Sequence, residues 1–147
     1  MLNALTRRAW LRAASAALLL LGAGCATPPP QQALPPIVFV HGNGDSAAQW
    51  TTMLWRFESN GWPRERLHAI DLPYPLARDE DDKPQPGRSS SDEHMRALAA
   101  EVDQVLKATG AAKLVLYGSS RGANAIRNYV DNGGGAAKVS HAILGGG

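Results

Sequence analysis

A serine between two glycines, Ser120, is the residue of this chain best suited to covalent chemistry. In residues 115–126, V-L-Y-G-S-S-R-G-A-N-A-I, an apolar strand-like run passes through this serine into a helix-like run. Because Gly118 and Gly122 carry no side chain, strand and helix can pack closely and hold the serine in a sharp turn. A serine oxygen exposed there attacks a carbonyl carbon once a base removes its proton. We therefore predict that Ser120 is a nucleophile.

A second motif follows the first apolar run of the chain's body. Residues 37–41, I-V-F-V-H, predict a buried strand, and H-G-N-G at residues 41–44 turns the chain directly after it. Loops that follow neighbouring parallel strands meet at the same edge of a sheet. We expect His41 to stabilise this loop rather than to transfer protons, and Gly42 and Gly44 to permit its turn.

The remaining elements must bring these two motifs together. Strand-like and helix-like runs alternate, which predicts a parallel sheet with catalytic loops at the carboxyl ends of its strands. Ser46 is expected to cap the first helix, and Ser90 with Glu93 has the spacing of a capping box before the second. The segment from Pro73 to about Ser89 is expected to be a surface loop. Strands are predicted at residues 37–41, 66–71, 113–117 and 138–144, and helices after Ser46 up to Asn60, after Ser90 up to Gly110, and from Arg121 to about Tyr129.

This order of elements resembles the α/β-hydrolase family, in particular bacterial secreted lipases and esterases. The resemblance runs from about residue 37 to residue 147 and depends on two linked motifs, H-G-N-G at residues 41–44 and G-S-S-R-G at residues 118–122. It implies a three-layer α/β fold with a mostly parallel sheet.

The resemblance also implies what the site does. A carboxylic ester, either a small molecule or a lipid, is the expected substrate, and it would be hydrolysed through an acyl-enzyme on Ser120 without a cofactor. In the family, backbone N–H groups at the positions of Asn43 and Arg121 stabilise the oxyanion. The side chains of these two residues are expected to be incidental.

In the family an acid and then a histidine follow the nucleophile, and after Ser120 this chain offers only Asp131 and His141. Asp131 is expected at the end of the helix after Ser120, and His141 within a strand, so we assign neither to a triad. The sequence also stops directly after a predicted strand. These observations indicate that residues 37–147 are the amino-terminal part of a longer hydrolase domain, truncated after that strand, and that this chain alone is nearly inactive.

Residues 1–24 have the features of an export signal. Residues 6–12, T-R-R-A-W-L-R, resemble a twin-arginine translocation signal. The apolar run that follows, residues 13–24, is too short for a membrane span of about 20 residues but suits a secretory signal. We therefore expect an exported protein, either periplasmic or secreted, with a general secretory signal as the alternative.

The only cysteine, Cys25, follows this run in the sequence L-G-A-G-C. The sequence resembles a bacterial lipoprotein cleavage box, whose cysteine receives a lipid and anchors the protein to a membrane. Ordinary cleavage at the neighbouring small residues is the alternative. Residues 25–36 are rich in proline and are expected to form a linker.

Composition narrows the possible partners. With 147 residues, 44% of them hydrophobic, the chain has room for one domain. Of its fifteen basic residues, three are arginines of the leader, and the remaining twelve face thirteen acidic residues, a net charge of −1. Such a body lacks the basic patch that nucleic acid requires. We expect a monomer with no metal site.

Two other functions stay open. Gly42, Gly44 and Ala47 fit the pattern G-x-G-x-x-A after a strand, and Asp71 ends the next strand, which is typical of a dinucleotide-binding protein that carries a nicotinamide or flavin. That interpretation leaves the glycine-flanked Ser120 unexplained. The other alternative is a membrane-tethered hydrolase fold that binds a lipid or a partner without catalysis.

Overall fold

Four parallel strands form the central sheet of the computed structural model, which describes residues 34–146. The predicted leader, Cys25 and most of the predicted linker lie outside the described residues. The strands lie in the order β2-β1-β5-β6. Their bounds are β1 (Ile37–Val40), β2 (Leu67–Ile70), β5 (Leu114–Ser119) and β6 (Val139–Gly145). The predicted parallel sheet is confirmed, with boundaries that shift by one or two residues.

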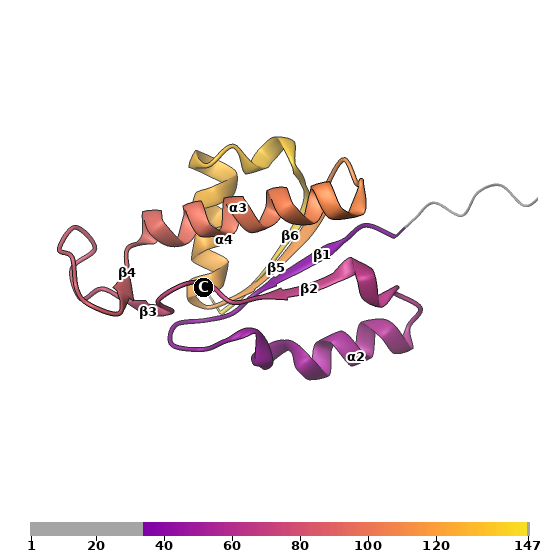
Figure 1. Cartoon of the computed structure of the whole chain (residues 1–147), viewed down its shortest axis with the longest axis horizontal. Coiled ribbons are helices and arrows are strands. Elements are labelled where there is room, and N and C mark those ends of the chain that lie inside the picture. Colours follow the sequence, from indigo (N-terminus) through magenta and orange to yellow (C-terminus); the bar gives the residue numbers. More distant parts are fainter. Residues whose placement is uncertain (1–33, 147) are drawn as a thin grey trace, which may run out of the picture. The chain divides into compact units, whose positions relative to one another are not determined.

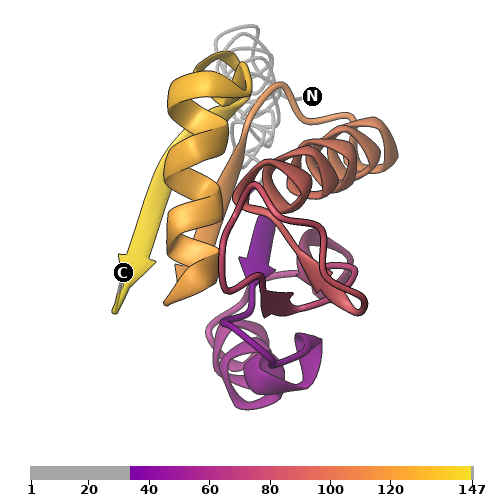
Figure 2. The same ribbon diagram turned by 90° about the vertical axis from the view of Figure 1, so that its left-hand side faces the viewer.

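Helices cover both faces of this sheet (Figure 1). One face packs against α2 (Thr51–Ser59), and the other against α3 (Ser91–Thr109) and α4 (Arg121–Asn132), which lie next to each other in Figure 2. Along β1 the side chains alternate between the two cores. Ile37 and Phe39 contact the α2 layer, whereas Val38 and Val40 contact the α3 and α4 layer. This burial on both faces explains why β1 is apolar throughout, and it confirms the three-layer fold.

The start and the end of α3 follow the sequence prediction. Ser90 Oγ accepts a hydrogen bond from the Glu93 N–H at 3.1 Å, and the Ser90 N–H donates to Glu93 Oε2 at 2.7 Å. The helix ends at Gly110, whose φ of 65° is left-handed. The predicted capping box is therefore confirmed. Within residues 34–146 no helix has both the length and the apolar character needed to cross a bilayer.

The start of α2 differs from the prediction. A short 3₁₀ helix, η1 (Ala47–Trp50), precedes α2, and the Ser46 side chain caps neither. Instead, Asp71 Oδ1 accepts a hydrogen bond from the Ala47 N–H at 2.7 Å. Asp71 directly follows β2, the neighbour of β1, so its charged oxygen reaches the first turn from another segment. The prediction of a Ser46 cap was wrong for this reason.

The segment expected to be a plain loop contains a small second sheet. Its strands, β3 (Leu76–Ala77) and β4 (Arg88–Ser89), pair in parallel, and Arg88 Nη1 donates to the carbonyl oxygen of Ala77 at 2.6 Å. Strands of two residues are too short to show alternation in a sequence. We call residues 73–89 the strap. Two further 3₁₀ helices, η2 (Arg64–Arg66) and η3 (Gly135–Ala137), precede β2 and β6.

Candidate active site

Ser120 lies on a strained turn between β5 and α4. Its φ of 50° and ψ of −119° are unusual for a residue other than glycine, and its side chain is exposed. Such a conformation costs on the order of 1–3 kcal/mol and persists where the surroundings impose it. The turn therefore presents the serine oxygen at the carboxyl edge of the sheet, as a nucleophile requires.

The two flanking glycines allow this close approach. A Cβ atom on Gly122 would lie 2.5 Å from the carbonyl oxygen of His41 and would also collide with that of Val40. A Cβ atom on Gly118 would lie 2.6 Å from Ile126 Cδ1 and 2.8 Å from a backbone nitrogen of α4. Any side chain at either position would push α4 away from β1 or β5.

The loop after β1 lies beside the serine. A Cβ atom on Gly42 would be 3.4 Å from Ser120 Cβ. His41 is buried and holds this loop, because its Nδ1 donates to the Gly42 carbonyl oxygen at 2.9 Å and its Nε2 accepts from the Leu72 N–H at 3.0 Å. Both ring nitrogens are thus occupied, which suits the loop-stabilising role expected from the sequence.

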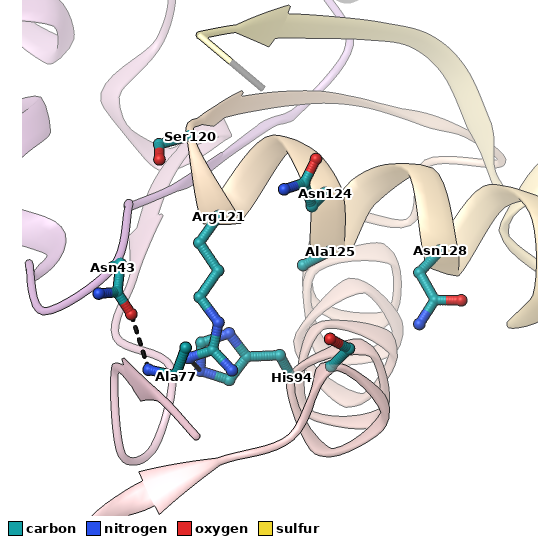
Figure 3. Close-up of a pocket in the computed structure, with 9 residues that line it drawn as sticks. Asn43, Ala77, His94, Ser120, Arg121, Asn124, Ala125 and Asn128 are labelled. Atoms are coloured by element: carbon teal, nitrogen blue, oxygen red, sulfur yellow. Dashed lines mark hydrogen bonds between the residues drawn. The ribbon is translucent and has the colours of Figure 1, made fainter. Parts of the chain in front are cut away.

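A cavity of about 610 Å³ opens beside Ser120 (Figure 3). Its walls come from the loop after β1, from β3, from the first turn of α3 and from residues 121–128 of α4. Side chains of Asn43, His94 and Arg121 line it together with that of Ser120. The cavity is therefore polar on several sides and includes both of the predicted oxyanion residues.

The side chains of Asn43 and Arg121 are not incidental, contrary to the expectation from the sequence. Asn43 Oδ1 accepts a hydrogen bond from the Ala77 N–H at 2.7 Å (Figure 3). Arg121 Nη1 donates to the Pro75 carbonyl oxygen at 3.0 Å, and its Nη2 to the Ser89 carbonyl oxygen at 2.5 Å. Burial lowers the pKa of the Arg121 guanidinium, which nevertheless stays charged. Both side chains hold the strap against the site.

His94 is a residue of the site that the sequence analysis did not single out. It is 2% exposed, and its Nε2 accepts from Arg121 Nη1 at 3.2 Å. Burial and the positive charge of Arg121 lower the pKa of His94 to about 4, although interactions with the backbone of the strap act in the opposite direction. With its acceptor nitrogen occupied, His94 is unsuited to remove a proton from Ser120. Its place four residues before Leu98 on the buried face of α3 was the signal in the sequence.

The two residues considered for a triad lie away from the serine. His141 pairs with Val115, five residues before Ser120, which is about 16 Å along the strand. Asp131 is exposed on α4, eleven residues after Ser120 and about 16 Å along the helix. Neither lines the cavity.

The residues of the dinucleotide pattern serve other contacts. The carboxylate of Asp71, which that interpretation would place on a ribose, accepts the hydrogen bond of the Ala47 N–H. In the part of the chain that the structure describes, no cluster of three or more histidine, cysteine or acidic side chains could hold a metal ion.

Comparison with known proteins identifies the class of this chain. Residues 35–147 match the family described as alpha/beta hydrolase fold. Together with the parallel sheet and the strained serine turn, this match shows that the chain belongs to the α/β-hydrolase fold family. The match agrees with the hydrolase interpretation of the sequence and not with the dinucleotide-binding alternative.

Particular solved structures resemble it. The mature form of the lipase BlEst2 from Bacillus licheniformis has a TM-score of 0.59 and 25% identity over 84% of this chain and 44% of that chain. Its propeptide form gives the same TM-score and identity over 81% of this chain and 23% of that chain. An epoxide hydrolase from an endophytic Streptomyces agrees in fold, with a TM-score of 0.54 and 22% identity over 78% of this chain and 31% of that one. The chain thus spans less than half the length of these structures.

Proposed function

We propose that this protein is a serine carboxylic ester hydrolase of the lipase or esterase type, which forms an acyl-enzyme on Ser120. The observation that carries the proposal is the exposed serine on a strained turn, with the Gly42 loop beside it and a cavity in front. The similarity to a bacterial lipase supports the same chemistry. A serine at this turn favours acyl transfer. Attack of its hydroxyl on a carbonyl carbon needs only a base to remove the proton and donors to stabilise the oxyanion.

The proposed reaction has two halves. Ser120 Oγ attacks the ester carbonyl while a base takes its proton, and the resulting oxyanion accepts hydrogen bonds from the backbone N–H groups of Asn43 and Arg121. Arg121 is the first residue of α4, so its N–H has no partner within the helix and the helix dipole favours negative charge there. Each such donor contributes about 3 kcal/mol to lowering the barrier. The intermediate expels the alcohol, and water then hydrolyses the acyl-enzyme.

We assign the acid and base of the triad to none of the described residues that line the cavity. Because the chain spans less than half of the two lipase structures, we propose that residues following Gly147 in a longer protein supply them. In the absence of the base, the chain by itself should be nearly inactive.

The leader, residues 1–24, supports a proposal about where in the cell the protein acts. We propose that residues 1–24 direct export and are removed, and that Cys25 receives a lipid that anchors the enzyme to a membrane. The substrate would then be a small-molecule or lipid ester met outside the cytoplasm. Mass measurement of the mature amino terminus distinguishes a lipidated Cys25 from simple cleavage.

Kinetics with matched variants test the proposed reaction. The protein extended through its natural reading frame should hydrolyse a short-chain nitrophenyl ester. Ser120→Ala should lower kcat by about 10³-fold or more, whereas Ser119→Ala, the adjacent serine of the same motif, should leave it within about twofold. Full activity of Ser120→Ala would contradict the proposal. Full activity of the unextended chain would contradict the idea that the base lies elsewhere.

A further inference from the structure

One backbone carbonyl joins the two loops that carry the proposed oxyanion donors. The carbonyl oxygen of Pro75 accepts a hydrogen bond from the Gly44 N–H at 3.1 Å and a second from Arg121 Nη1 at 3.0 Å. Gly44 directly follows Asn43, and Arg121 directly follows Ser120. The strap therefore links the loop after β1 to the serine turn through a single atom.

The guanidinium of Arg121 also holds the other end of the strap. Its Nη2 donates to the Ser89 carbonyl oxygen at 2.5 Å, and its Nη1 lies 3.3 Å from Ser89 Oγ. Ser89 Oγ in turn donates to the Tyr74 carbonyl oxygen at 2.7 Å. A planar group with several donors in fixed directions can bind two carbonyl groups at once, which an ammonium does less well. Arg121 thus joins the two ends of the strap.

The held conformation is strained. Tyr74, next to Pro75, has a φ of 48°, a left-handed value for a residue with a side chain. Such a turn persists only where neighbouring contacts impose it. The bonds from Arg121 to Pro75 and from Ser89 to Tyr74 lie directly at this turn. Without the guanidinium, the turn has lost one of the contacts that keep the Pro75 carbonyl facing Gly44.

We propose that the side chain of Arg121 is a positioning residue for the oxyanion hole. It acts through the Pro75 carbonyl, which fixes Gly44 and with it the N–H of Asn43 relative to the N–H of Arg121. The hydrogen bond from the Ala77 N–H to Asn43 Oδ1 is a second link between the strap and this loop. This inference rests on the proposed ester hydrolysis, because it assigns a task to donors that only that reaction uses.

The kinetic signature separates positioning from general stabilisation. Donors that act on the oxyanion matter in the transition state, so a misplaced donor lowers kcat and leaves KM unchanged. In Arg121→Met the backbone N–H remains and only the guanidinium is lost. We expect kcat on a nitrophenyl ester to fall at least about tenfold, with KM within about twofold, in the protein extended through its natural reading frame.

Arg78→Met is the matched control. The Arg78 guanidinium binds Glu93 at 2.8 Å and the Asp81 carbonyl oxygen at 3.1 Å, so it also stabilises the strap, but its hydrogen bonds go to these groups and not to the Pro75 carbonyl oxygen. We expect its kcat to stay within about twofold of the wild type. If Arg121→Met does not fold, Arg121→Lys replaces it: the ammonium keeps the charge but not the planar fork, so kcat should still fall below that of the wild type while KM stays within about twofold.

A second measurement uses the 147-residue chain itself. In the wild type the amide of Gly44 is bonded to Pro75, so its hydrogen exchange by NMR should be slow, faster in Arg121→Met and unchanged in Arg78→Met. An unchanged kcat, or a change in KM alone, would overturn the positioning role, as would unchanged exchange at Gly44. If the wild type shows no hydrolysis that depends on Ser120, the proposed function fails, and the exchange result alone decides whether Arg121 holds this loop.

Discussion

At the scale of single residues, the site contains an arginine and a histidine, Arg121 and His94, whose roles cannot be told from the sequence alone. Arg121 supplies a backbone N–H to the proposed oxyanion hole and a side chain to the strap. His94, which lies against it, is a buried neutral acceptor rather than a catalytic base. Protonation of His94 is therefore expected to change the stability of the fold and not proton transfer from Ser120.

Burial of His94 makes stability depend on pH. Its pKa falls to about 4 in the folded protein, because of burial, the Arg121 charge and a smaller effect of His41, against 6.5 when unfolded. The unfolded chain binds more protons between these values, so stability decreases as the pH falls through this window. Between pH 7.5 and pH 5 we expect a loss of about 2 kcal/mol from this residue, measured by urea unfolding.

His94→Gln is the control for that measurement. Glutamine can still accept a hydrogen bond from Arg121 but does not titrate. The half-buried His68, whose pKa is also lowered by burial, is present in both proteins, so the difference isolates His94. An equal loss of stability in the variant would show that His94 is not the group responsible.

At the scale of elements, the serine turn depends on how closely α4 approaches β1. Gly122, in the first turn of α4, faces the carbonyl groups of Val40 and His41 at the end of β1. No flexible side chain at this contact can move aside, because the opposing atoms belong to the backbone. Helix and strand must therefore separate if a methyl group is added.

Gly122→Ala should destabilise the fold by about 3 kcal/mol, at the upper end of the usual cost of overpacking. Gly145→Ala is a suitable control, because its Cβ would meet nothing closer than the Gly118 carbonyl oxygen at 3.6 Å. Urea unfolding at neutral pH measures both. Equal midpoints for the two variants would show that the close approach at Gly122 is not required.

At the scale of the whole molecule, the sheet and its helices could be predicted because their signals are local and periodic. The apolar run of β1 and the capping box of α3 each lie within a few residues, and both match the structure. The glycines around Ser120 indicated the turn for the same reason. The resemblance to a known family then supplied the order of the elements.

The strap and its contacts could not be predicted in this way. Arg121 and Pro75 are 46 residues apart, and Asn43 and Ala77 are 34 apart. Bonds from side chains to the backbone of a distant loop leave no periodic pattern, and strands of two residues show no alternation. For the same reason the partner of Asp71, the Ala47 N–H group 24 residues away, could not be identified from the sequence.

The central claim is that Ser120 is a nucleophile presented by a strained turn. The most direct measurement is peptide mass spectrometry of the protein, extended through its natural reading frame, after treatment with a fluorophosphonate. We expect one phosphonyl adduct, on Ser120 and not on the adjacent Ser119, and no adduct in Ser120→Ala. An adduct on another residue, or none in an extended protein that hydrolyses esters, would contradict the account.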